Sequence, residues 1–491
     1  MIKTIFDKFR KPILIIGVLV LFVVSSQFQK GLNQNRDDMG LTDLAPLENA
    51  PPMLAFTTVA LGGFRGLIAN ALWMRATDLQ ENDKYFEMVQ LSDWITKLQP
   101  KITTVWYHLA WNMAYNISVK FRSPEERWMW VQRGIELLRD EGLVYNPTDT
   151  LLYRELSWFF QHKMGANLDD AHYHYKASWK ALMEEVLGTT RDGYRDLIDP
   201  QDEAARQRAE VLKTKYKMNP ATMAEVDDKH GPFDWRLPEA HAVYWAYLGW
   251  RDAVAEEKMT VRRSIYQSMQ MSFQRGKLIE NPFTQTYELA PNLDIIPKVD
   301  AAYVQMMEEE PEQRDHIDGA HRNFLKKAVY FMYLGARRTE AEELLARLME
   351  LYPQAVNPTL SLDEYAVEQA QEDVGETSSV DTTAMIQGFL FHHFAYLAVG
   401  EDERATGYYN LARSTYKRYS YETRKSTQRV RLRSFDAFRT DVINNLINPA
   451  NEYPEDMVAQ LKSLLGLSEE TSEVSFIDEE ENSDQDETGT K

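Results

Sequence analysis

The chain of 491 residues contains no cysteine, which removes several classes of chemistry at once. Disulfide bonds, a cysteine-linked lipid anchor, thiol catalysis and cysteine-ligated zinc or iron–sulfur sites are all excluded. The sequence also lacks a His-Glu-x-x-His metal motif, a dinucleotide-binding glycine fingerprint, a Walker phosphate loop and a nucleophile-elbow motif. We therefore expect no cofactor.

The ten histidines are poorly spaced for joint coordination of a metal. The closest pairs are His172 with His174, His316 with His321, and His392 with His393. Two side chains that are one, two or five residues apart point in different directions from a helix. The two rings of such a pair are therefore poorly placed to coordinate one metal ion together. We expect no metal site.

Positive charge is scarce: 55 Lys and Arg stand against 75 Asp and Glu, giving a net charge of −20. Half of this excess lies in residues 469–487, which carry ten carboxylates and no base. Such a run predicts a disordered acidic tail over 468–491. The rest of the chain is only mildly acidic and 12% aromatic, which indicates a folded body and argues against a nucleic-acid partner.

A long hydrophobic run occurs only near the start of the chain. Four basic residues between Lys3 and Lys11 precede an almost wholly apolar run over 13–24. This order predicts a membrane-directed segment over 1–28 with the bulk of the chain outside the cytoplasm, in the periplasm. The run has the length of a signal-peptide core and could just span a bilayer, so a single-pass signal anchor and a cleaved signal peptide both remain open. Residues 29–52 read as a polar linker.

The remainder of the chain is dominated by helical spacing, most clearly over 70–115. Apolar residues recur three or four positions apart, first in a segment before Asn82 and again in a segment that Pro100 closes. The apolar positions are Leu72, Ala76 and Leu79, then Leu91, Ile95 and Leu98. Two helices of this length cannot bury their apolar faces alone and need a neighbouring pair. The pattern predicts an all-α fold in which helical hairpins stack as an α-solenoid.

The spacing of these residues resembles that of tetratricopeptide repeats, helical hairpins of about 34 residues. Leu72, Ala76, Leu79, Ile95 and Pro100 fall on signature positions, and Trp106, Leu109 and Ala110 match the opening of the next repeat. Met88 and Ser92 depart from the pattern, because a small residue and an aromatic are usual there. The resemblance recurs over 325–353 and 387–416, and it implies a stacked superhelix that binds other proteins.

These patterns divide the body of the chain into four parts. We expect tetratricopeptide-like repeats over 53–187, a helical insertion over 188–231, helical repeats with a Trp-rich loop over 232–310, and further tetratricopeptide-like repeats over 311–467. Within the third part, a long helix is expected to run to Leu278, and a loop rich in Pro and Asn to follow over 281–297.

The most distinctive loop lies at 230–250. Asp234, Arg236, Glu239 and His241 lie within eight residues there, beside Trp235, Tyr244 and Trp245. One interpretation is a pocket in which the carboxylates perform acid–base chemistry and the aromatic rings stack on a sugar or peptide. The interpretation we favour is structural: Asp234 caps a helix and pairs with Arg236, while the Trp residues pack the core.

Together these patterns predict a membrane-anchored extracytoplasmic scaffold that binds envelope proteins through its helical surface. The candidate binding residues are Trp106, Trp235, Arg236, Tyr244 and Trp245. The alternative is an α-helical envelope enzyme acting on glycan or peptide, with Asp234 and Glu239 as its catalytic carboxylates. A third possibility is a ligand carrier with an aromatic pocket.

Overall fold

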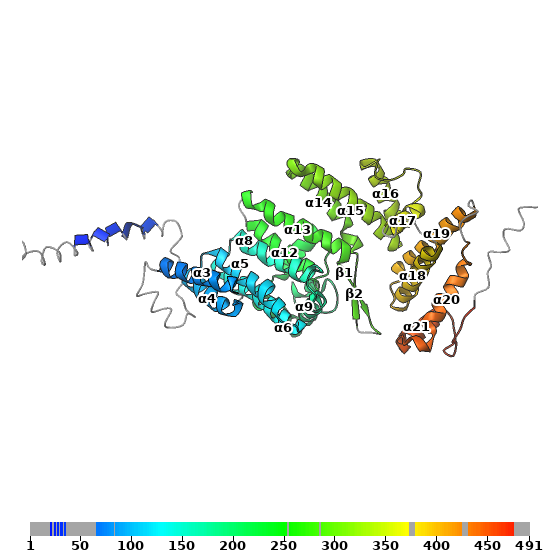
Figure 1. Cartoon of the computed structure of the whole chain (residues 1–491), viewed down its shortest axis with the longest axis horizontal. Helices are drawn as coiled ribbons and strands as arrows, with labels where there is room; N and C mark the ends of the chain where they lie inside the picture. The colour runs from blue at the N-terminus through cyan, green and yellow to red at the C-terminus, as the bar shows by residue number, and fades with distance from the viewer. Residues whose placement is uncertain are drawn as a thin grey trace, which may run out of the picture. The chain divides into compact units, whose positions relative to one another are not determined.

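The computed structural model describes residues 65–475 except 83, 253–254, 284–285, 373–378 and 425–430, together with a few residues between 20 and 35. In this part of the chain the fold is all-α apart from one two-stranded sheet, as the sequence predicted (Figure 1). No helix in the described ranges combines the length and apolar character needed to cross a membrane. The predicted linker and most of the predicted membrane segment and acidic tail lie outside the described residues.

The chain divides into two compact units, Met1–Leu156 and Ser157–Lys491. The first unit begins with the predicted hairpin, in which α3 (Arg65–Glu81) packs on α4 (Tyr85–Leu98). Ala69 and Ile95 from these helices are fully buried together. The first helix ends just before Asn82 and the second just before Pro100, so the apolar spacing and the breaks both predicted this hairpin.

The next helices of the first unit contain π-helical turns that the sequence did not reveal. Helix α5 (Thr103–Trp111) continues as a π-helix over Asn112–Ile117, and α6 (Pro124–Glu136) continues as one over Leu137–Gly142. Ser123 caps α6 by accepting a hydrogen bond from the Glu126 backbone N–H. Helix α8 (Thr150–Trp158) begins in this unit. A π-turn adds a residue to the helical repeat, and it therefore shifts the buried face without changing composition.

The second unit begins with a further π-helix, Phe159–Gly165, and continues through five helices that surround the Trp-rich loop. These are α9 (His172–Leu187), α10 (Glu203–Thr214), α11 (Pro220–His230), α12 (Pro238–Asp252) and α13 (Ala255–Arg275). Helix α12 packs on α13 and on the π-helix. Eleven residues of α12 are buried, so it is the central helix of this region.

A β-hairpin follows α13, where the sequence predicted the end of a helix and then a loop. Strand β1 (Lys277–Asn281) pairs antiparallel with β2 (Thr286–Ala290). The prediction was wrong because α13 already ends at Arg275. The strands are also too short to show a clear alternation, and their stability comes from distant residues. Ile279 and Ala290 pack against Tyr396 and Ala405, more than a hundred positions away.

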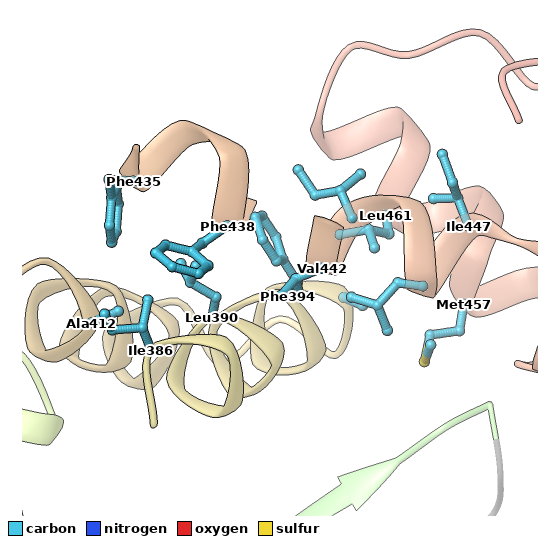
Figure 2. Close-up of a cluster of buried hydrophobic side chains, with 13 residues drawn as sticks. Ile386, Leu390, Phe394, Ala412, Phe435, Phe438, Val442, Ile447, Met457 and Leu461 are labelled. Atoms are coloured by element: carbon cyan, nitrogen blue, oxygen red, sulfur yellow. The ribbon is translucent and has the colours of Figure 1, made fainter. Parts of the chain in front are cut away.

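The remaining helices run from α14 to α21. They are α14 (Ile296–Glu309), α15 (Arg314–Leu334), α16 (Arg338–Leu351), α17 (Leu362–Glu372), α18 (Ser379–Ala398), α19 (Asp402–Arg424), α20 (Phe435–Ile447) and α21 (Glu455–Leu464). Helix α15 packs on α16 and α18 on α19, which are the two later hairpins that the sequence predicted. Figure 2 shows that α18, α20 and α21 share one apolar core, to which Phe394, Phe438 and Leu461 contribute.

Close packing of α15 against α19 requires a glycine at position 407. A Cβ atom at Gly407 would lie 1.8 Å from the backbone oxygen of Leu334, a contact that backbone cannot relieve locally. We therefore expect Gly407→Ala to lower the free energy of unfolding by about 2 kcal/mol or more, as overpacking does. Urea denaturation followed by circular dichroism measures this change.

Gly388 in α18 supplies the matched control. A Cβ atom there meets nothing within 4 Å, so Gly388→Ala should raise the free energy of unfolding by up to about 1 kcal/mol through helix propensity. Equal stability of the Gly407→Ala variant and the unmodified chain would contradict the close packing.

Candidate functional site

The loop between α11 and α12 is held by Asp227, a residue that the sequence analysis did not single out. Its Oδ1 atom accepts hydrogen bonds from the Phe233 backbone N–H (2.8 Å) and from Trp235 Nε1 (3.3 Å). Lys298 Nζ also donates to the Asp227 backbone oxygen (3.0 Å). Burial raises the pKa of Asp227, although the hydrogen bonds from Phe233 and Trp235 act to lower it. The loop therefore has a fixed conformation around one buried carboxyl group.

Asp234 and Arg236 form a buried, two-pronged ion pair at the end of this loop. Arg236 donates from Nε to Asp234 Oδ1 (2.9 Å) and from Nη2 to Asp234 Oδ2 (2.7 Å). The Arg236 backbone N–H also donates to Oδ1 (3.1 Å), and the two side chains are only 5% and 7% exposed. Both carboxylate oxygens are thus engaged. The structural interpretation of the loop predicted this ion pair. It also predicted that Asp234 caps a helix, whereas Asp234 caps the turn before α12 by accepting from the Arg236 backbone N–H.

The same ion pair positions a second segment of chain. Arg236 Nη1 donates to the Thr189 backbone oxygen and lies 3.5 Å from Glu184 Oε1. The Trp235 backbone N–H donates to the Arg191 backbone oxygen (3.2 Å). The loop therefore fixes the stretch that follows α9, including the position of Arg191.

Glu239, the other predicted catalytic carboxylate, belongs to a separate buried group. Its side chain is 2% exposed and Oε1 lies 3.3 Å from Arg275 Nε, while neither oxygen accepts a hydrogen bond from another described residue. Burial raises the pKa of Glu239, and Arg275 and Lys176 oppose this shift. Burial also lowers the pKa of Lys176 to about 8. Asp234 and Glu239 therefore take part in different ion pairs and do not share a partner.

The predicted binding aromatics are interior side chains. Trp235, Tyr244 and Trp245 are 0%, 2% and 3% exposed, and the Trp235 ring lies edge-on to those of Tyr194 and Tyr244. In the first unit, Trp106 is 1% exposed and donates from Nε1 to the Pro100 backbone oxygen (2.8 Å). These rings pack the core in the described structure, and a part for them in binding stays a prediction.

Arg236 and Asp234 also form one wall of a pocket of about 380 Å³ within the second unit. The other walls come from the end of α13, from β1, from residues 291–294, and from α15 and α19. The charged residues that line it are Arg191, Asp234, Arg236, Lys277, Asp294, Arg337, Glu403 and Arg404. The apolar ones include Leu278, Leu293, Phe331 and Leu334. The volume falls within the range typical of ligand sites.

Asp294 joins two sides of this pocket. It accepts hydrogen bonds from Arg337 Nη1 (2.7 Å) and from Arg191 Nη1 (3.1 Å). Burial opposes ionisation, but these two guanidinium groups lower the pKa of Asp294 overall. Its segment is held by Asn292, whose side chain donates to the Pro232 backbone oxygen (2.6 Å). The loop between α11 and α12 thus positions the pocket walls on both sides, whereas the rest of the predicted loop, from Pro238 on, is helical.

Sequence reasoning missed most of the pocket because its residues are far apart along the chain. Arg191 and Arg404 are separated by more than two hundred positions, and neither belongs to a local motif. Within the described ranges, no group of three or more His, Asp and Glu side chains is arranged to hold a metal ion.

Comparisons of the chain with protein-family models, with curated proteins and with solved structures found no match. The tetratricopeptide-like resemblance and the predicted domain boundaries therefore remain predictions from the sequence.

His241 of α12 gives the fold a testable dependence on pH. Its ring is fully buried against Trp179 (4.9 Å between centroids) and Phe160 (5.4 Å), and Nε2 lies 2.8 Å from the Trp235 backbone oxygen. Burial lowers the pKa of His241 to about 4 from its ordinary 6.5. Between these values the unfolded chain binds the proton and the folded chain does not. The free energy of unfolding is therefore undiminished by His241 above pH 6.5 and falls as the pH drops from 6.5 towards 4.

From pH 7 to pH 5, we expect His241 alone to remove about 2 kcal/mol from the free energy of unfolding. His241→Gln should make the decline shallower by about that amount in urea denaturation at each pH. The exposed His316 provides the control, because His316→Gln should keep the decline of the unmodified chain. Identical declines for all three proteins would contradict the assignment.

Proposed function

We propose that the chain is a membrane-anchored extracytoplasmic scaffold that binds envelope proteins through the surface of stacked helical hairpins. The observation that carries this proposal is the distribution of exposed apolar side chains. Residues 65–156 expose nine large apolar side chains, whereas the described part of 157–475, more than three times as long, exposes eight. An exposed apolar surface of this density is typical of a protein-binding face.

Two aromatic residues of α4 stand out on this surface. The side chains of Phe86 and Trp94 are 54% and 49% exposed. They are eight residues apart, with Gln90 at the intermediate turn, so they lie on the same side of the helix. Aromatic side chains are the residues that most often supply binding energy at protein interfaces. We therefore place the partner contact on this side of α4.

A groove beside these aromatics supports the same placement. It has a volume of about 510 Å³ and includes Gln90 and Asp93 from α4. Its charged residues are Asp93, Arg133, Glu136, Asp140 and Glu141, and its apolar ones are Val89, Leu109, Met113 and Leu137. Asp93 pairs with Lys97 and Asp140 with Arg139, so Glu136 and Glu141 against Arg133 leave an excess of one negative charge. This excess favours a partner segment that carries basic and apolar side chains.

The stacking of hairpins as an α-solenoid is part of this proposal. Support comes from the order of contacts: α15 packs on α16, α18 on α19, and α15 and α17 also pack on α19. Each pair thus buries a face that it could not bury alone, as repeat architectures do. The enzyme alternative has less support, because Asp234 is saturated by Arg236 and Glu239 lies in a different buried group.

Cross-linking in native membranes, followed by affinity isolation and quantitative mass spectrometry, tests the proposal. We expect a stoichiometric protein partner whose recovery falls about tenfold or more in a Phe86→Ser, Trp94→Ser variant, because loss of two aromatic anchors weakens an interface by at least that factor. The melting temperature of the variant shows whether its fold is retained.

The matched control changes two exposed apolar residues of the second unit, Val211→Ser and Leu351→Ser, which are 39% and 44% exposed in the unmodified chain. This variant should recover the partner fully. Equal recovery with both variants, or no stoichiometric partner, would argue against binding through the surface of α4.

A further inference from the structure

We propose that the pocket lined by Arg191, Arg337 and Arg404 binds the carboxylate of an organic ligand whose neighbouring group is apolar. The pocket lies within the second unit and is separate from the surface proposed for partner binding. The inference therefore does not depend on the scaffold function. Its basis is the charge, the free donors and the apolar wall of the pocket.

The charge of the pocket favours a single negative charge. Two of its cations are already neutralised: Arg236 by Asp234, and Lys277 by Glu401 at 2.6 Å. Three guanidinium groups, those of Arg191, Arg337 and Arg404, then face two carboxylates, Asp294 and Glu403. The remaining excess is one positive charge, in a chain whose net charge is −20. A carboxylate balances this excess, whereas a phosphate group carries up to two negative charges.

The arginines of the pocket keep donors available. Arg191 donates to Asp294 through Nη1 alone, and its other nitrogens make no hydrogen bond to a described residue. Arg337 also donates to Asp294 through Nη1 alone, and its Nε lies 4.0 Å from Glu403. A guanidinium group has five N–H donors in a planar fork that matches a carboxylate. Asp294 therefore orients two guanidinium groups and leaves each of them with free N–H donors.

Arg404 is the third cation, and Tyr396 rather than a carboxylate holds it directly. Its Nη2 donates to the Tyr396 hydroxyl (3.0 Å), and the guanidinium lies 4.6 Å from the centre of the Tyr396 ring. No carboxylate of a described residue forms an ion pair with it, and its buried Nε has no hydrogen-bond partner. The Tyr396 hydroxyl in turn donates to Glu288, so this carboxylate meets Arg404 only through the hydroxyl, and the guanidinium keeps donors for an anionic ligand.

The apolar side of the pocket indicates what kind of group adjoins the carboxylate in the ligand. Leu278 of β1, Leu293, and Phe331 and Leu334 of α15 line the same space as the arginines. A pocket of about 380 Å³ with one charged and one apolar side fits a carboxylate next to an apolar group of side-chain size. The carboxyl end of a peptide and a free acylated amino acid both present this chemistry.

Fluorescence anisotropy and calorimetry on the purified full chain test the proposal. The probes are hexapeptides ending in leucine, phenylalanine, methionine or valine, each as the free acid and as the amide, together with N-acetyl-leucine. We expect at least one free acid to bind, and its amide to bind roughly tenfold or more weakly because the charge-assisted hydrogen bonds are lost. Binding of the hexapeptide acid only identifies a peptide terminus, and equal binding of N-acetyl-leucine identifies a small organic acid.

The variants Arg191→Gln and Arg404→Gln should each weaken binding of the free acid about tenfold. The control is Arg338→Gln: Arg338 is an exposed neighbour of Arg337 that pairs with Asp363 outside the pocket, and this variant should bind normally. Melting temperatures establish that the variants fold.

The proposal is overturned if no free acid binds, if acids and amides bind equally, or if both pocket variants bind as the unmodified chain does. Displacement of the acid by inorganic phosphate at equal concentration would also overturn the assignment to a carboxylate. None of these outcomes affects the partner surface on α4, because the probes do not involve it.

Discussion

The buried ion pair between Asp234 and Arg236 is the interaction on which the arrangement of the second unit depends. Removing two charges from water is costly, and the cost is offset only when geometry and additional hydrogen bonds are favourable. Here Arg236 makes two charged hydrogen bonds to Asp234 and a third to the Thr189 backbone oxygen. The pair thereby joins the start of α12 to the segment after α9. In the same loop, the backbone oxygen of Pro232 accepts a hydrogen bond from the side chain of Asn292. One short loop therefore positions two walls of the pocket.

The two units present surfaces of opposite character. In the first unit, the groove beside α4 carries four carboxylates and one arginine and lies next to exposed aromatic side chains. In the second unit, the pocket near α15 and α19 carries an excess of arginine and an apolar wall. Opposite charges select different ligands and suppress the wrong ones. A protein that binds one partner through a broad face and a carboxylate ligand in a pocket would use these two surfaces independently.

The sequence predicted those features that depend on local spacing. Leu72 and Ile95 revealed the first hairpin because apolar residues recur with the helical period, and Pro100 marked its end. The pairing of Asp234 with Arg236 was also predictable, since two residues of opposite charge two positions apart on a turn can meet. Local sequence thus accounts for the helices and for the inner part of the loop.

Features that depend on distant contacts were not predictable in this way. The β-hairpin is stabilised by Tyr396 and Ala405, which lie over a hundred residues later, so its short strands resemble a loop in the sequence alone. The π-helical turns leave the amino-acid composition of their helices unchanged, so the sequence gives no sign of them. The pocket brings Arg191 together with Arg404 through the packing of several helices, and single-sequence reasoning has no access to such a pairing.

The stability of an Asp234→Ala variant is the most direct test of the claim that this residue has a structural role. Because the change leaves Arg236 buried without its partner, we expect the free energy of unfolding to fall by about 3 kcal/mol or more. Adding Arg236→Met removes the unpaired charge, so the second substitution should cost less than the first. The exposed pair Arg251–Asp252 gives the comparison, since Asp252→Ala should cost less than about 1 kcal/mol. An equally small loss for Asp234→Ala would contradict the account and would restore Asp234 as a candidate for chemistry rather than architecture.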